Sequence, residues 1–197
     1  LLLIFSHPFT GVEITLILSA WALLEKLMIR DTDVPWQFLG VQILLLGLIY
    51  GYYFFYLGMD PEHSSVHNQF SLRWSFGRYQ IIFAYSLTGL LVLGRILESG
   101  STIEIVSRKS DRFFFTWFLV AFLLSKHEWF MNPIQPLHFT RGYIWSPLFL
   151  LGYPFLRSVF LRLGSQKRIL IKYGLVSSII FLLLSDNLPL FLIALFL

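Results

Sequence analysis

The sequence predicts an all-α protein, a polytopic bundle of transmembrane helices, and three observations support this prediction. Hydrophobic residues make up 56% of the 197 residues and charged residues only 13%, which is about half the charge of an average soluble domain. Six apolar stretches are long enough, or nearly so, to cross a bilayer. Phe, Trp and Tyr together reach 18%, as in bundles with aromatic belts at both membrane interfaces.

The six predicted spans form a single transmembrane domain over residues 1–197. They cover residues 11–29, 36–58, 79–98, 113–130, 143–161 and 169–185. The apolar residues 1–5 and 188–197 are too few to cross, so we expect partial spans at both ends and a chain that is a piece of a larger protein. Because the chain has no cysteine, disulfides and thiolate metal sites are excluded.

Alternating the connecting segments between two sides places all five histidines on one side. The other side collects eleven of the fifteen Lys and Arg residues: Lys26, Arg30, Arg95, Arg108, Lys109, Arg112, Arg157, Arg162, Lys167, Arg168 and Lys172. The positive-inside rule makes this basic side cytoplasmic, in a plasma (inner) membrane, and turns the histidines outward. Since the basic residues lie in short loops between spans, they indicate contact with membrane lipid and not with nucleic acid.

The first complete span, 11–29, contains ionisable residues. An acid inside a span, such as Glu13, is costly and is by default interpreted as functional. His7 lies six residues earlier, where it can neighbour Glu13 across the turn. The alternative for Glu13 is a helix cap at the interface. If this span were re-entrant, His7 would change sides. Near the cytoplasmic ends of other spans, snorkelling explains Arg95, Glu98 and Arg157 without function.

The longest outer loop follows the span 36–58, which Pro35 and Trp36 open and a tyrosine-rich girdle closes. Asp60-Pro61-Glu62 predicts a helix start, with Asp as the cap and Pro at the first position. His63 and His67 then lie on one helix face at i and i+4. With Glu62 they are candidate ligands of a divalent metal ion. The alternative is a set of polar residues at the membrane surface.

The outer loop 127–142 is the best candidate site. Its two prolines forbid a regular helix, so we expect an extended backbone that displays Gln135, His138 and Arg141. The Arg141 guanidinium matches the geometry of a phosphate or carboxylate, and Gly142 lets the backbone approach a ligand closely. The alternative is a structured cap, with Arg141 paired to phospholipid or to Glu128.

The stretch Arg141-Gly142-Tyr143-Ile144-Trp145-Ser146-Pro147 resembles a late-loop pattern of GT-C-type glycosyltransferases. The resemblance implies a polytopic enzyme that takes a sugar from a polyprenyl-phosphate donor at the extracytoplasmic face, with Arg141 at the donor phosphate. Such a transfer needs a general base and stabilisation of a leaving phosphate. We expect Glu13 and His138 as catalytic residues, and substrate contacts from Arg141, His7, Gln135 and Tyr143.

Two other functions stay open, a secondary transporter and a non-catalytic membrane protein. Transporters place their binding groups at the midplane, on broken helices with buried charge. In this sequence the polar groups gather near one surface, which favours interfacial chemistry.

Overall fold

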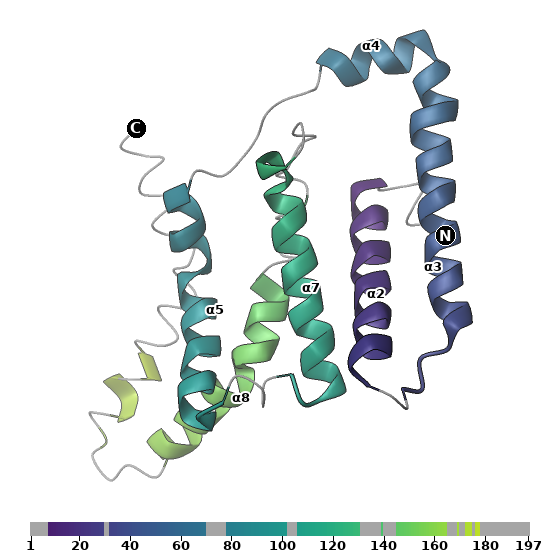
Figure 1. The fold of residues 1–197 in the computed structure, drawn as a ribbon. Helices are drawn as coiled ribbons and strands as arrows, with labels where there is room; N and C mark the ends of the chain where they lie inside the picture. The colour runs from purple at the N-terminus through teal and green to yellow at the C-terminus, as the bar shows by residue number, and fades with distance from the viewer. Residues whose placement is uncertain are drawn as a thin grey trace, which may run out of the picture. The chain divides into compact units, whose positions relative to one another are not determined.

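A computed structural model describes residues 8–29, 32–69, 78–101, 106–130, 139, 145–164, 169, 172–174 and 176–177. Within these residues the secondary structure is helical and contains no strand, which confirms the all-α prediction. The helices are α2 (Pro8–Met28), α3 (Trp36–Tyr50), α4 (Pro61–Gln69), α5 (Arg78–Ser99), α7 (Lys109–Ser125) and α8 (Trp145–Gly164) (Figure 1).

One helical stretch among the described residues, Trp36–Met59, is long and apolar enough to cross a membrane. It spans 24 residues, and its most apolar 18-residue segment has a mean hydropathy of 1.8. Only 12% of that segment is buried inside the protein. This stretch matches the predicted span 36–58. Helices also occupy the predicted spans 11–29, 79–98, 113–130 and 143–161, whereas 169–185 lies mostly outside the described residues.

The chain divides into two compact units by its internal contacts. Unit 1 comprises residues 1–75 and 116–144, and unit 2 comprises residues 76–115 and 145–197. Helix α7 contributes its first residues to unit 2 and the rest to unit 1.

In unit 1, α2 and α3 lie side by side and antiparallel (Figure 1). At the end where they are joined, the Trp21 ring meets Phe38 edge-on at 6.4 Å between centroids. Lys26 Nζ lies 5.1 Å from the centroid of the Trp36 ring, a cation–π contact. The Lys26 ammonium is therefore placed over an aromatic ring.

Helix α3 does not end at Tyr50 but continues through a π-helical turn, Gly51–Tyr56, and a 3₁₀ turn, Leu57–Met59. α4 then leaves in a new direction (Figure 1). Its start confirms the prediction from Asp60-Pro61-Glu62, because the Glu62 backbone N–H donates to Asp60 Oδ1 at 3.0 Å. The Asp60 side chain thus caps the first turn of α4.

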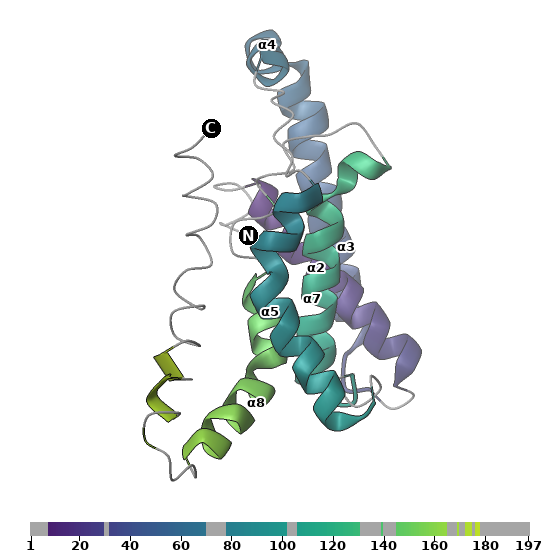
Figure 2. The ribbon, with the colours of Figure 1, turned by 90° about the vertical axis from the view of Figure 1, so that its left-hand side faces the viewer.

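In unit 2, α5 and α8 pack closely along their length (Figure 2). The crossing depends on two glycines. A Cβ atom on Gly152 would lie 2.5 Å from Leu91 Cβ and 3.0 Å from the Leu91 backbone carbon, and one on Gly94 would overlap the Phe155 ring. Small residues at such contacts let helix backbones approach, so these glycines set the spacing of α5 and α8.

Candidate functional site

A fully buried carboxylate lies in the second turn of α2. Glu13 has 0% of its surface exposed, and neither carboxylate oxygen has a hydrogen-bond partner among the described residues. The nearby hydroxyls donate to backbone carbonyls of α2 and not to Glu13: Thr15 donates to Gly11 O and Ser19 donates to Thr15 O, each at 2.7 Å. Buried polar groups are normally paired. Among the described residues, therefore, nothing occupies the carboxylate oxygens of Glu13.

An aromatic cluster in unit 1 includes the N-terminal end of α2, the end predicted to face outward. The Phe9 ring meets Phe139 edge-on at 5.7 Å, and Phe139 meets the His127 ring edge-on at 5.9 Å. Phe9 and Glu13 are one helical turn apart, on the same face of α2. Phe139 is 6% exposed and follows His138 in the chain. Phe139 therefore packs at the helix end that carries Glu13.

His127, which the sequence analysis did not single out as a site residue, is buried at 4% exposure. Its Nδ1 lies 2.5 Å from the Leu124 carbonyl oxygen. A carbonyl only accepts, so Nδ1 carries the proton and the lone pair of the neutral ring is on Nε2. Beside it, Lys126 Nζ forms an ion pair with Glu128 at 3.2 Å. The signal in the sequence is the sudden polarity of Ser125-Lys126-His127 inside the predicted span 113–130, which ends α7 at Ser125.

Other predicted site residues lie outside the described part of the chain: His7, Gln135, His138, Arg141 and Tyr143. Glu62 and His63 are both on α4, where Glu62 is exposed and His63 is half-buried, while the side chain of His67 is not described. Within the described residues, no three His, Cys, Asp or Glu side chains are grouped closely enough to hold a metal ion. The divalent metal at Glu62, His63 and His67 therefore stays a prediction.

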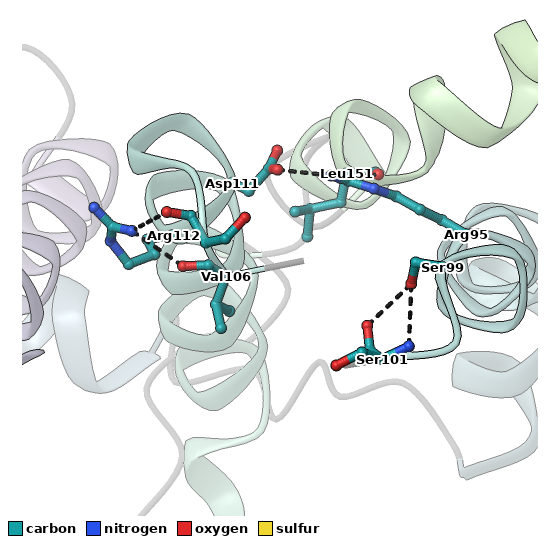
Figure 3. Close-up of polar contacts among 8 residues, drawn as sticks. Arg95, Ser99, Ser101, Val106, Asp111, Arg112 and Leu151 are labelled. Carbon is teal, nitrogen blue, oxygen red and sulfur yellow. Dashed lines mark hydrogen bonds and ion pairs between the residues drawn. The ribbon is translucent and has the colours of Figure 1, made fainter. Parts of the chain in front are cut away.

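A second polar cluster occupies unit 2, at the end of α5 that is predicted to be cytoplasmic (Figure 3). Arg95 Nη2 lies 2.7 Å from Asp111 Oδ2, and the two side chains are 12% and 8% exposed. Arg95 Nη1 donates to the Leu151 carbonyl oxygen at 2.8 Å. The snorkelling interpretation of Arg95 is therefore wrong, since its guanidinium is turned inward and joins α5, α7 and α8.

The neighbouring Arg112 organises the start of α7. Its Nη1 donates to the carbonyl oxygens of Val106 at 3.1 Å and Ser107 at 2.6 Å (Figure 3). Arg112 is 6% exposed, so this turn is built around a buried guanidinium. These two arginines are satisfied by the protein, and this cluster has the character of a structural tie. The buried carboxylate of Glu13, which has no partner within the described part of the chain, makes the N-terminal end of α2 the better candidate for chemistry.

Comparison with protein-family models, with curated proteins and with solved structures finds no match for this chain.

Proposed function

We propose that the chain is an integral membrane protein of six spans with its basic loops in the cytoplasm. The apolar stretch Trp36–Met59 and the helices in four further predicted spans support this proposal. The split of eleven basic residues against four, Arg73, Arg78, Lys126 and Arg141, supports the orientation.

Cysteine labelling tests the orientation directly, because the chain has no cysteine of its own. Cysteines placed at Ser65 and Thr140 should react with an impermeant thiol reagent added to intact cells, and one at Ser107 should react only after permeabilisation. Ser65 and Ser107 are both exposed in the fold, so their reactivity reports the side of the membrane. Labelling of Ser107 alone from outside would invert the orientation.

For a protein with this topology, the function we propose is glycosyl transfer from a polyprenyl-phosphate-linked sugar at the extracytoplasmic face. The observation that carries the proposal is Glu13, a fully buried carboxylate with no hydrogen-bond partner in the residues that the structure describes. It lies near the end of α2 that Phe139, a residue of the predicted outer loop, contacts. In this proposal the buried Glu13 carboxylate is the general base, and the guanidinium of Arg141 stabilises the leaving phosphate. These are the two groups that the transfer needs.

In the proposed reaction, Glu13 accepts the proton of the acceptor, and Arg141 stabilises the negative charge of the leaving phosphate. As the acceptor hydroxyl oxygen bonds to the sugar C1, Glu13 takes the hydroxyl proton. The bond from C1 to the phosphate oxygen breaks, and the electron pair leaves with the polyprenyl phosphate. The Arg141 guanidinium holds the growing negative charge of that phosphate through two parallel N–H donors. His138, His7, Gln135 and Tyr143 would orient the sugar and its acceptor.

Arg141 variants test this proposal in membranes that contain the full protein. If Arg141 grips the phosphate with two donors, Arg141→Lys should lose activity almost as badly as Arg141→Ala, because a point charge cannot replace the planar fork. The expected loss is about 2–3 kcal/mol of transition-state stabilisation, the value of one preorganised donor. The measurement is transfer of labelled sugar from a polyprenyl-phosphate donor, normalised to inserted protein. If Arg141→Ala transferred sugar at the wild-type rate, the proposed role of Arg141 and its loop in the reaction would be wrong.

A proton- or cation-coupled carrier is the second candidate, and the same Glu13 favours it. A buried carboxylate on a span is a typical coupling site in transporters. The carrier function predicts solute uptake that depends on Glu13 in sealed vesicles and no transfer of sugar from the lipid-linked donor. The transferase function predicts the opposite pair of results.

A further inference from the structure

The middle of α8 contains a proline, Pro154. Proline has no backbone N–H, so the Leu150 carbonyl lacks its usual intrahelical donor, and the ring pushes the preceding turn away. Such a residue kinks a helix, and α8 changes direction along its length (Figure 2). In membrane helices the backbone groups freed by proline are satisfied by neighbouring helices. A donor close to Pro154 therefore has a defined role.

Arg95 of α5 donates to this turn, at the carbonyl one residue beyond the one that the proline frees. Its Nη1 reaches the carbonyl oxygen of Leu151, the residue next to Leu150, at 2.8 Å, and Leu151 is 1% exposed. The other terminal nitrogen, Nη2, is 2.7 Å from Asp111 Oδ2 in the first turn of α7. The ion pair orients the guanidinium, which holds the buried face of α8 in the turn before Pro154.

The half of α8 on the C-terminal side of the kink has its own contacts with α5. Ser158 donates to Glu98 Oε1 at 2.7 Å, and Arg162 pairs with the same carboxylate oxygen. On the N-terminal side, the Tyr85 and Trp145 rings meet at 6.4 Å. Both halves of α8 therefore have contacts with α5, and the kink sets the angle between the two halves.

We propose that Arg95, oriented by Asp111, fixes the kink of α8 and so sets the position of the N-terminal half of that helix. This proposal goes beyond the transferase function and does not depend on it. A guanidinium serves the carbonyl and the carboxylate at once because its donors are held in one plane. A lysine ammonium at this position keeps the charge but lacks the fork.

Spin-label distances test the proposal. One pair of labels, Leu97→Cys with Ser146→Cys, spans the kink, and a second pair, Leu97→Cys with Leu161→Cys, lies on one side of it. All three positions are exposed. The eight residues from Ser146 to Pro154 cover roughly 12 Å of helix, so a change of about 20° in the kink should move the label at residue 146 by about 4 Å. We expect Arg95→Met to shift or broaden the first distance by this amount and to leave the second unchanged.

Three comparisons decide the outcome. Glu98→Gln breaks the exposed pair between the same two helices and should leave both distances as in the wild-type sequence. Arg95→Lys should move the first distance toward the value in Arg95→Met, and this variant decides the question if the methionine variant fails to insert. An unchanged first distance in the Arg95 variants overturns the proposal. A simultaneous change of both distances also overturns it, because it means that the packing of α5 on α8 is lost as a whole.

Discussion

Glu13→Gln should abolish most of the transfer activity while leaving the protein folded. Glutamine has nearly the volume of glutamate but cannot take a proton from the acceptor hydroxyl. Positioned acid–base groups contribute about 10²- to 10⁴-fold to a rate, and we expect a loss in this range. Because the Glu13 carboxylate is fully buried and lacks a hydrogen-bond partner among the described residues, its removal should not lower stability. The measurement is the rate of sugar transfer per folded protein.

Glu25 provides the matched control for this experiment. It is also a buried carboxylate of α2, with 1% of its surface exposed, but it lies at the other end of the helix. Glu25→Gln changes charge and volume in the same way as Glu13→Gln, and it should keep the transfer rate. Equal losses in both variants would show that α2 merely needs its carboxylates for folding. A wild-type rate in Glu13→Gln would remove Glu13 as the base.

Arg95→Met should cause a large loss of stability in unit 2. The substitution leaves the Asp111 carboxylate, whose side chain is 8% exposed, without its cation. Breaking a buried pair on one side costs about 3–5 kcal/mol. Asp111 lies in the first turn of α7, where the helix dipole favours an anion, so we expect a value in the lower half of this range. The free energy of unfolding in mixed detergent micelles measures the loss.

Two further variants separate the ion pair from general packing. The double substitution Arg95→Met with Asp111→Leu removes both charges and should recover most of the lost stability, since apolar residues of similar volume often replace a buried pair without cost. Glu98→Gln breaks the pair with Arg162, whose side chain is 69% exposed, and should cost about 0–1 kcal/mol. A double variant as unstable as Arg95→Met would mean that the packing of the methylene chain, and not the charge, is what matters.

Local sequence was sufficient to predict the helices and some of their ends. Apolar runs predicted α2, α3, α5, α7 and α8, because a helix of a bundle needs a long stretch that buries apolar surface or faces lipid. The start of α4 followed from Asp60-Pro61-Glu62, since a cap and its N–H partner are two residues apart. Helix α7 ends at Ser125, inside the predicted span 113–130, where the polar run from Ser125 to His127 is buried in the protein.

The candidate site was predictable only in part. Glu13 stood out because acids are rare inside apolar runs, and the fold added that it is fully buried and lacks a hydrogen-bond partner among the described residues. The signal for His127 was weaker, because a polar run that contains a histidine near the end of an apolar stretch usually lies at an interface. Its burial depends on Phe139, which is twelve residues away in the chain and in ring contact in the fold.

The sequence by itself determined the helical class and the division into apolar runs and polar turns, and it predicts the sorting of basic residues to one side of a membrane. These properties depend on composition and on neighbours in the chain. Only the tertiary structure decided the roles of Arg95 and Glu98, which the sequence placed together as snorkelling residues three positions apart. Arg95 is turned inward to Asp111 and Leu151, whereas Glu98 pairs at the surface with Arg162. Whether a charge is buried or exposed depends on which distant groups the packing of helices brings within hydrogen-bond distance, and no local pattern contains that information.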